Sequence, residues 1–355
     1  MTTASRPSTT NTLEAIAARG GVSPATLSRV LNHPEMVSSA LRAKAEKLLA
    51  DAGYIPHGAA RSLASRHTRT MGAAIPTVDS ALFARLVDGF QQTIQQHGFQ
   101  LLLASTNYEP EREASEIRAL LERGVDGMLL VGSSRSSDVY ELLRSKAVPF
   151  VTTCHYDANA PWPCVGWDNV AEAERIARYL VDIGHRRFGI IAGITSDNDR
   201  AADRVKGFLR ALARRNIWLP ASNIIERHYT IPDARSALAA LLRLPEPPTA
   251  VMCGNDILAY GALQECLWQN VRIAEDISIT GFDDIDMAAH CRPGITTLHV
   301  PAYQVGQRAA AIMLEKSSHA PPEHVYVDLE LIVRETTAPP HRSRSGGRKI
   351  EKMLT

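Results

Sequence analysis

The stretch GVSPATLSRVLN, residues 21–32, decides the fold of the N-terminal region. Gly21 favours a turn, and Ser23 followed by Pro24 matches the residues preferred at the N-cap and at the first position of a helix. Its apolar residues are Val22, Leu27, Val30 and Leu31. The other face of this helix carries small and polar side chains, which a helix buried in a core does not need. We therefore expect that face to contact a molecule outside the protein.

Helices are also predicted on both sides of this stretch. Leu13, Ile16 and Ala17 have helical spacing, and the glycines at 20 and 21 end the first helix. A third helix is predicted after Ser38, with an apolar stripe made of Leu41, Ala45, Leu48 and Leu49. Gly53 ends it. Three short helices with a tight turn between the first two indicate a helix-turn-helix domain over residues 10–55.

The charge of the chain is unevenly distributed. Residues 1–70 contain nine Lys and Arg against four Asp and Glu, whereas residues 71–340 contain 25 against 33. The tail from 341 adds five basic residues and one acidic residue. A basic N-terminal module on an acidic body favours a polyanion-binding head.

Double-stranded DNA is the partner that this head predicts. The second helix of a helix-turn-helix enters the major groove with its N-terminal residues toward the bases. The outward positions here are Ser23, Pro24, Ala25, Thr26, Ser28 and Arg29. Hydroxyl groups can bind phosphates or bases, and an arginine can donate two hydrogen bonds to guanine.

Residues 56–69 form a predicted hinge linker between the head and the body. Pro56 disfavours helix at the residue before it, and the segment AARSLASR, residues 59–66, is long enough for only about two turns. So short a helix is marginal in water. We expect it to be helical only when a partner holds it.

A strand–helix alternation begins at Thr70 and indicates an α/β body with parallel sheets. The strand candidates are TMGAAIP (70–76), FQLLLAS (99–105), VDGMLLVG (125–132), VPFVTTC (148–154), CVGWDN (164–169), RFGIIAG (187–193), TAVMCGN (249–255), DISITGFDD (276–284) and VYVDLELIV (325–333). We expect two doubly wound subdomains within residues 70–338. The N-subdomain comprises 70–164 with 300–338 and the C-subdomain 165–299, followed by a disordered basic tail at 339–355.

The head and linker resemble the lactose-repressor (LacI) family of bacterial transcription regulators. The resemblance rests on T-L-x-x-I-A from Thr12, GVSPATLSRVLN, V-S…L-R, and GYIP…AARSLA, and extends loosely to about residue 337. It implies a periplasmic-binding-protein-like body and a homodimer that reads a pseudo-palindromic operator. It also implies a hinge helix near 58–65 whose Leu63 wedges into the minor groove. The further DNA contacts that it implies are Thr12, Asn32, His57 and Arg61, with His57 standing where the family usually has Asn.

Polar and aromatic residues follow the predicted strands of the body, where open α/β sheets bind ligands. They are Asp79, Leu82, Phe83, Asp168, Asn169, Arg200, Arg204, Tyr229, Asn255, Asp256, Asp283 and Asp284. Such side chains suit a polar molecule rich in hydroxyl groups, although Asn169 and Asp256 also fit helix N-caps. The family resemblance selects as effector contacts Phe83, Asp168, Arg204, Tyr229, Asn255 and Asp283.

The class of effector stays open in the sequence. The segments NHPEMVSSALR (32–42) and VGWDN (165–169) resemble gluconate-type repressors, which favours a sugar acid. A neutral sugar and a purine are the alternatives. Whether the effector releases DNA or promotes its binding is equally open.

The remaining patterns disfavour catalysis, cofactors and membranes. The acidic residues 283–286 and the pair Cys154-His155 lack a metal-ligand frame, and the chain contains no P-loop, GxGxxG or nucleophile elbow. No apolar run reaches the roughly 18 residues of a membrane span. The five scattered cysteines and the polar N-terminus predict a cytoplasmic protein. The competing interpretation is a soluble sugar-binding protein or an enzyme on the same body, in which the head would have no role.

Overall fold

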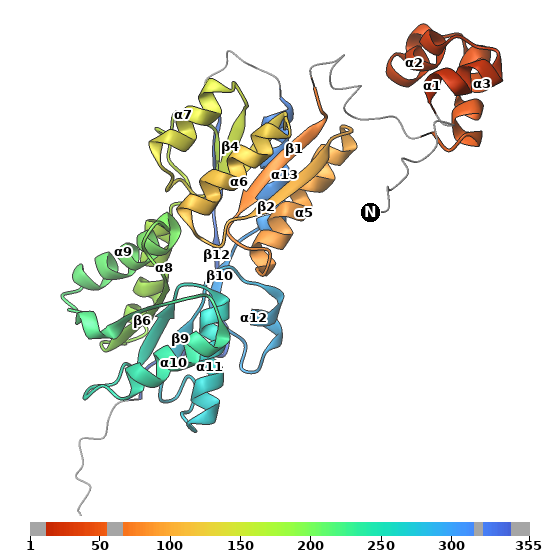
Figure 1. The fold of residues 1–355 in the computed structure, drawn as a ribbon. Helices are drawn as coiled ribbons and strands as arrows, with labels where there is room; N and C mark the ends of the chain where they lie inside the picture. Colours follow the sequence, from red (N-terminus) through yellow and green to blue (C-terminus); the bar gives the residue numbers. More distant parts are fainter. Residues whose placement is uncertain (1–11, 55–66, 316–321, 342–355) are drawn as a thin grey trace, which may run out of the picture. The chain divides into compact units, whose positions relative to one another are not determined.

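The head folds from three short helices joined by tight turns (Figure 1). They are α1 (Leu13–Gly20), α2 (Pro24–Asn32) and α3 (Ser39–Asp51), with a 3-10 turn, η2 (Pro34–Met36), between α2 and α3. The computed structural model describes residues 12–54, 67–315 and 322–341. The chain divides into a unit at 1–68 and a unit at 69–355, which we call the head and the body.

The core of the head is the one that the helical spacing predicts. Its buried side chains are Ile16, Ala17, Leu27, Val30, Ala45 and Leu49. Gly21 follows α1 with φ 59°, a left-handed conformation that a residue with a Cβ adopts at a cost. The prediction was wrong for Leu41, which is 37% exposed because it lies on the outer side of α3.

The body begins with a parallel sheet of six strands in the order β11-β5-β4-β3-β1-β2. The strands are β1 (Thr70–Ile75), β2 (Gln100–Ser105), β3 (Gly127–Val131), β4 (Phe150–Thr153), β5 (Cys164–Gly166) and β11 (His324–Tyr326). Ala73 pairs with Leu103 on one side and Leu129 on the other. β1, β3 and β4 are almost fully buried because helices cover both faces of this sheet.

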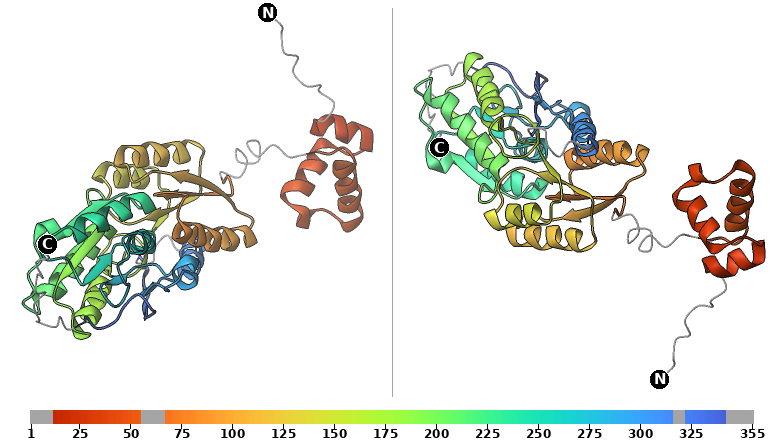
Figure 2. Two further views of the ribbon diagram at one scale, coloured as in Figure 1. Left: turned by 90° about the horizontal axis from the view of Figure 1, so that it is seen from below. Right: turned by 90° about the horizontal axis from the view of Figure 1, so that it is seen from above.

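Two pairs of helices cover this first sheet. They are α5 (Ala81–Gln96) with α13 (Ala302–Leu314), and α6 (Pro110–Glu122) with α7 (Ser137–Ser145). The first pair buries Phe90 and Val305 against one face, whereas Ile117 and Leu143 pack on the other. Figure 2 shows α13 beside α5, although more than 200 residues separate them in the chain. The helix near 301–316 therefore returns to the first sheet, as the sequence suggests.

A second parallel sheet has four strands in the order β7-β6-β8-β9. These are β6 (Phe188–Gly193), β7 (Ile224–Arg227), β8 (Ala250–Cys253) and β9 (Ser278–Thr280). Its helices are α8 (Asn169–Asp182), α9 (Asp199–Ala213), α10 (Ile231–Leu242) and α11 (Asp256–Trp268), with the short α12 (Asp286–His290) after β9. Ile190 faces α8 and α9, while Ile191 faces α10 and α11, as the alternation of a strand requires.

The strands at which the chain crosses between the two halves of the body differ from the predicted ones. The segment 325–333, predicted as one strand, forms β11 in the first sheet and β12 (Glu330–Ile332), which pairs antiparallel with β10 (Thr297–His299). β7 and β10 were not among the predicted strands. The expected boundary at 165 lies inside β5, which pairs with β4 and β11 of the first sheet.

The last described residues belong to the second half rather than to the first. Thr336 accepts a hydrogen bond from the backbone of Ile279, and the backbone of Ala338 donates to Ser278 Oγ at 3.1 Å. The buried His185 bonds the carbonyl of Ala338 at 3.0 Å. Pro340 is partly buried beside Gly184, so the chain still packs on the body after residue 339, where the disordered tail was expected to begin.

Candidate DNA-binding head and effector pocket

Two of the predicted DNA contacts first hold the helices of the head. Ser23 Oγ accepts from the backbone N–H of Thr26 at 3.0 Å and lies 2.8 Å from the Thr26 hydroxyl. Thr12 caps α1 by accepting from Ala15 N at 3.3 Å. These bonds satisfy N–H groups that a helix start leaves without partners. The turn therefore presents the N-terminus of α2 in one fixed conformation.

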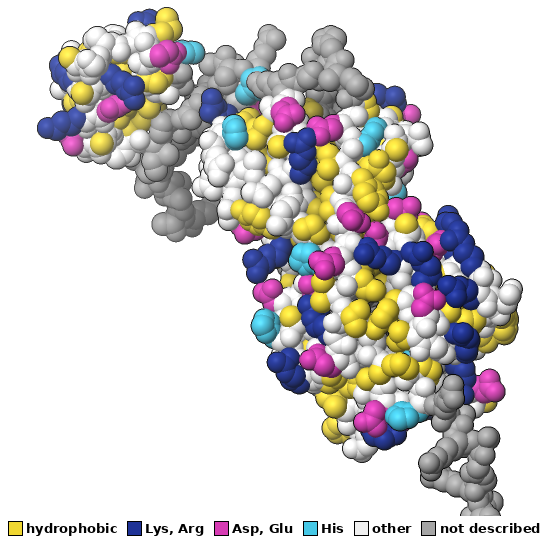
Figure 3. All heavy atoms as spheres, turned by 180° about the vertical axis from the view of Figure 1, so that it is seen from behind, with side chains coloured by type: hydrophobic (Ala, Val, Ile, Leu, Met, Phe, Trp, Pro, Cys, Tyr) yellow, Lys and Arg dark blue, Asp and Glu magenta, His cyan; other side chains and the backbone are white. Residues whose placement is uncertain are grey.

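The start of α2 forms an open polar surface on the head. Ser23, Pro24, Ala25 and Arg29 are exposed, and Thr26 and Ser28 are half-buried. Lys and Arg side chains are spread over the face of the head visible in Figure 3. A small, polar and basic helix face is what a major groove accepts. The assignment of these residues to DNA remains a prediction.

The remaining predicted DNA contacts lie outside the described residues. His57, Arg61 and Leu63 fall in 55–66, and Asn32 ends α2 without a described side chain. The hinge helix and its Leu63 wedge stay predictions from the family resemblance.

A pocket lies between the two halves of the body, where strand ends from both sheets meet. Its lining residues are Ser80, Leu82, Phe83, Tyr108, Cys154, Arg200, Arg204, Tyr229, Asn255 and Asp283. The structure thus brings together five of the six predicted effector residues. The cavity measures about 30 Å³, roughly the space of one water molecule.

Arg204 is the most firmly held side chain of the pocket. Its Nε donates to Asn169 Oδ1 at 3.0 Å, and Nη1 donates to the carbonyl of Gly254 at 2.6 Å. The guanidinium lies 3.5 Å from the centroid of the Phe282 ring. All of these contacts involve buried groups. The remaining nitrogen, Nη2, lies 3.6 Å from Asp283 Oδ1. That distance is too long for a good hydrogen bond.

Asp283 holds an unused acceptor inside the pocket. It is 6% exposed, and its Oδ1 has no hydrogen-bond partner among the described residues. Burial raises the pKa of this carboxyl to about 6, against the opposing effect of Arg204 and Arg200. Its backbone has φ 111°, a conformation that costs about 1–3 kcal/mol and is concentrated at functional sites. The site thus offers an acceptor beside a guanidinium donor.

Aromatic rings form the apolar part of the pocket. The rings of Tyr108 and Tyr229 lie 5.4 Å apart at their centroids, one from each half of the body. Phe83, on α5, is buried beside them. Burial raises the pKa of both tyrosines, so both phenols remain protonated donors near neutral pH. Flat rings beside polar groups suit a ligand with an apolar face and a hydroxyl-bearing edge.

Asp168 is the predicted effector residue that the pocket does not include. Its exposed carboxylate caps α8 by accepting from Val170 N and Ala171 N at 2.9 and 3.0 Å. The next residue, Asn169, is buried and bonds both Arg204 and the Trp167 indole. The prediction that Asn169 could cap α8 was therefore wrong, because Asp168 caps this helix and the side chain of Asn169 points into the body.

The pocket also includes residues outside the six effector contacts that the resemblance selects, among them Arg200, which the strand-end rule had already indicated. Tyr108 follows β2, Cys154 follows β4, and Arg200 lies one turn before Arg204 on α9. Ser80 caps α5. Tyr108 and Cys154 follow strand ends and could have been found by the rule that located Asn255 and Asp283. Their positive φ values, 61° and 60°, have no signature in the sequence.

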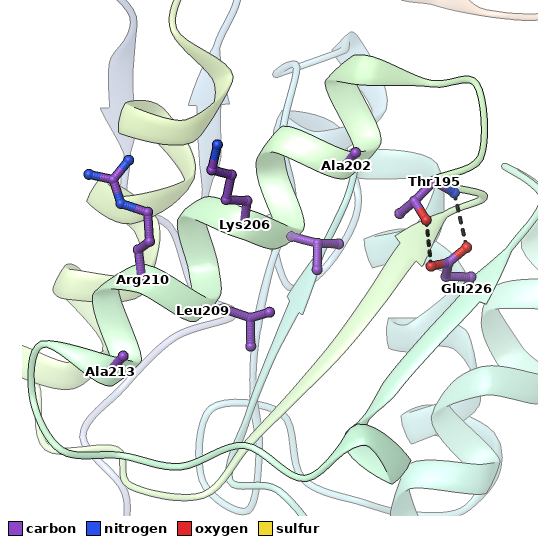
Figure 4. Close-up of a pocket in the computed structure, with 8 residues that line it drawn as sticks. Thr195, Ala202, Lys206, Leu209, Arg210, Ala213 and Glu226 are labelled. Carbon is purple, nitrogen blue, oxygen red and sulfur yellow. Dashed lines mark hydrogen bonds between the residues drawn. The ribbon is translucent and has the colours of Figure 1, made fainter.

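A larger hollow lies on the outside of the second half, between α9 and β7 (Figure 4). It has about 500 Å³ and is lined by Thr195, Ala202, Val205, Lys206, Leu209, Arg210, Ala213 and Glu226. Glu226 accepts from the hydroxyl and the backbone N–H of Thr195. None of the predicted effector residues lines it, and its aliphatic wall offers few directed polar groups. The predicted effector residues lie at the smaller, buried pocket instead.

The described part of the chain contains neither a metal-ligand cluster nor a membrane-spanning helix. Residues 12–54, 67–315 and 322–341 contain no group of His, Cys, Asp and Glu side chains that could hold a metal ion. None of the described helices is both long and apolar enough to cross a membrane.

Comparison with known proteins identifies the family. Residues 12–57 match the family of bacterial regulatory proteins of the lacI type, and residues 68–335 match the periplasmic binding proteins and sugar-binding domain of the LacI family. The chain belongs to the LacI family. It is 32% identical over 336 residues to the transcriptional repressor CytR of Escherichia coli K12, covering 94% of this chain and 98% of CytR.

Other members support the same placement. The ribose operon repressor of Haemophilus influenzae is 32% identical over 311 residues, covering 86% of this chain and 91% of that repressor. A solved structure of the transcriptional regulator CelR in complex with cellobiose covers 93% of this chain and all of the CelR chain, with 26% identity and a TM-score of 0.67. A LacI-family regulator from Silicibacter pomeroyi has a TM-score of 0.84 at 23% identity, covering 92% and 99%, and shows the common fold.

Membership gives the two units of the chain their functions. The protein is a DNA-binding transcriptional repressor whose body binds a small-molecule effector. Its partners are operator DNA, the effector and a second copy of the same chain, since LacI-family repressors act as dimers.

Proposed function

We propose that a sugar or sugar acid controls operator binding from the pocket between the two halves of the body. The observation that carries this proposal is the buried Oδ1 of Asp283, which has no hydrogen-bond partner in the described part of the chain and lies 3.6 Å from Arg204 Nη2. A hydroxyl group can donate to the first and accept from the second. The ribose operon repressor and the cellobiose-bound CelR, as relatives, favour a carbohydrate over a purine.

The size of the pocket indicates how such a ligand acts. A cavity of about 30 Å³ is far below the volume that holds a small-molecule ligand. Because the two halves supply opposite walls, a sugar enters only when these walls move apart. A ligand that binds one arrangement of the halves better than another shifts the balance between them. In a dimer, that shift changes the spacing of the two heads and hence operator affinity.

We further propose that the protein has no catalytic activity and works in the cytoplasm, where its operator lies. The Cys154 thiol is the one cysteine that lines the pocket, and burial raises its pKa to about 12. It is therefore a protonated thiol rather than a nucleophile at neutral pH. The buried Asp283 and Arg204 are suited to holding a ligand.

Thermal unfolding of the full-length protein against a panel of compounds tests the effector class. The panel contains D-ribose, D-gluconate, cellobiose, hypoxanthine and cytosine. A compound present at about 100 times its dissociation constant stabilises the protein by roughly 2.7 kcal/mol. We expect a carbohydrate to raise the Tm of the wild type but not of Arg204→Ala. Stabilisation by the bases alone would replace the sugar with a nucleobase ligand.

The dimer contact of the first half is predicted to include an exposed apolar surface at β2 and α5. Val78 is 61% and Leu103 44% exposed, beside an apolar hollow of about 260 Å³. β2 is also the edge strand of its sheet. Exposed apolar patches of this kind mark interfaces.

Leu103→Asp is therefore expected to weaken dimerisation by about tenfold or more, since burying an unpaired carboxylate in an apolar interface costs more than about 1.4 kcal/mol. Sedimentation equilibrium measures the change. The control is Trp218→Gln, which alters an apolar residue that is 81% exposed on the second half. Equal dimer affinities for wild type and Leu103→Asp would remove this surface from the interface.

A further inference from the structure

One carboxylate links the two halves of the body to the effector pocket. Asp199 begins α9 in the second half, and its Oδ2 accepts from the backbone N–H and the hydroxyl of Ser133, at 2.5 and 2.9 Å. Ser133 follows β3 of the first sheet. Oδ1 of the same carboxylate accepts from Arg200 Nη1 at 2.7 Å. Arg200 lines the pocket, so the two contacts of Asp199 join the first half to a pocket wall.

The loop that carries Ser133 is fixed within the first half. Arg135, whose side chain is 1% exposed, donates to the carbonyls of Val131 and Gly132 and to Glu113. The Tyr140 hydroxyl donates to the Ser133 carbonyl at 2.9 Å. These bonds hold the loop without help from Asp199. The N–H and hydroxyl of Ser133 therefore remain available to the other half.

Gly132 allows the Arg200 guanidinium to approach this loop. It has φ 72°, and a Cβ at this position would lie 1.8 Å from Arg200 Nη1 and 2.6 Å from Asp199 Oδ1. Any larger residue would push the guanidinium away from the end of β3. The close contact between the halves thus depends on a glycine as well as on a charge.

A purely local role does not account for Asp199. The start of α9 is already capped by Asn198, whose Oδ1 accepts from Ala201 N at 3.4 Å. Burial raises the pKa of Asp199, but Arg200 and the two Ser133 hydrogen bonds outweigh this effect, with a smaller contribution from His155, and the pKa lies below its ordinary value. Asp199 is thus charged at neutral pH and only 12% exposed, with Arg200 and Ser133 as its partners.

We propose that Asp199 is a positioning residue that couples the effector pocket to closure of the body, by holding Ser133 of one half and Arg200 of the other with a single carboxylate. An acceptor group of the effector that binds Arg200 competes with Asp199 and loosens the contact between the halves. A ligand that bridges both halves strengthens this contact instead. The proposal rests on the proposed effector role of the pocket. We call the contacts of Asp199 with Ser133 and Arg200 the clasp. The most direct consequence of the proposal needs no effector, because the clasp sets the closed state of the free protein.

A double-mutant cycle on operator affinity tests this clasp without any added effector. The full-length variants are Ser133→Ala, Asp199→Asn and the double variant, titrated with operator DNA at one salt concentration. We expect Asp199→Asn to change the operator Kd by about fivefold or more, the lower end of allosteric coupling. Ser133→Ala should act in the same direction but less, because its N–H remains. The double variant should change the Kd by less than the two single changes combined, because both substitutions act on one shared contact.

The control is Asp197→Asn in the same loop. Asp197 is exposed and contributes its backbone carbonyl to Ser134 Oγ, which the substitution retains. Its operator Kd should stay within about twofold of wild type. An Asp199→Asn protein with wild-type operator affinity would overturn the proposal, and so would full additivity of the two single changes.

A second variant covers the case in which Asp199→Asn does not fold. Gly132→Ala keeps the Asp199 charge but displaces both Arg200 Nη1 and Asp199 Oδ1, and we expect it to change operator affinity in the same direction. Unchanged affinity in a folded Gly132→Ala protein would also overturn the clasp. Failure of every sugar in the thermal panel would count against the proposed effector class only, because none of these titrations contains an effector.

Discussion

Asp283→Asn is expected to raise the Tm of the effector-free protein at pH 7.5 and to abolish its response to the effector. Burial without a hydrogen-bond donor raises the pKa of the Asp283 carboxyl from 3.8 to about 6. Near neutral pH the folded protein must therefore hold a charge that its surroundings disfavour. This increase of the Asp283 pKa corresponds to up to about 3 kcal/mol of lost stability. The neutral amide of Asn avoids this loss.

The pH dependence of this gain has a definite sign. Since the folded pKa lies above the unfolded value, the native state binds more protons between pH 4 and 6, and wild-type stability falls as the pH rises through this window. The advantage of Asp283→Asn is thus complete above about pH 6 and disappears toward pH 4. Thermal unfolding from pH 4.5 to 8 measures it. Asp286→Asn, at an exposed position with a surface ion pair to Arg85, is the control and should leave the Tm nearly unchanged.

The same substitution removes the anionic acceptor that we assign to an effector hydroxyl. Operator binding without effector should survive, because Asp283 lies in the body and takes no part in the hydrogen bonds between Asp199 and Ser133. A variant that gains no stability near pH 7.5 would contradict the strained, unsatisfied carboxylate. A variant that still responds fully to the effector would remove Asp283 from the binding site.

Arg29→Ala is expected to lower operator affinity by about tenfold to a hundredfold and to relax the preference for one base pair. An arginine that donates two hydrogen bonds to guanine contributes about 1–3 kcal/mol of discrimination. Arg29 lies exposed on α2, in the helix that Ser23 and Pro24 begin. Competition with single-base variants of the operator measures both effects.

The matched control for Arg29 is Arg42→Ala on α3, whose guanidinium pairs with Glu46 at 2.7 Å. It removes the same charge from the head, so its effect should be small and equal for all DNA sequences. Equal losses for the two variants, with base preference unchanged, would mean that Arg29 contacts phosphate rather than a base.

The head was predictable because its structure depends on neighbours in the sequence. Gly21 ends α1 in a left-handed turn, and Ser23 and Pro24 start α2, through interactions that span four residues or fewer. The buried stripe of three short helices follows from their period. The exposed Leu41 shows what helical spacing could not predict. Which side of α3 packs on the other helices depends on the angle at which the helices cross.

The pocket was predictable only in part. The rule that parallel strands carry ligand residues at their carboxyl ends located Arg204, Asn255 and Asp283. It did not reveal that Asp168 caps α8 while Asn169 turns inward, because a shift of one residue decides between the two roles. The division of 325–333 into β11 and β12 is equally invisible, since it occurs where the chain passes from one half to the other.

Operator titration with and without effector tests the central claim most directly. A fluorescent duplex obtained by in-vitro selection is titrated with the full-length wild type and with Arg204→Ala, at fixed salt, using a compound that stabilises the wild type. Effector control predicts that the compound changes the wild-type Kd by about fivefold or more and leaves that of Arg204→Ala unchanged. An equal change in both proteins, or none in the wild type, would contradict control of operator binding from this pocket.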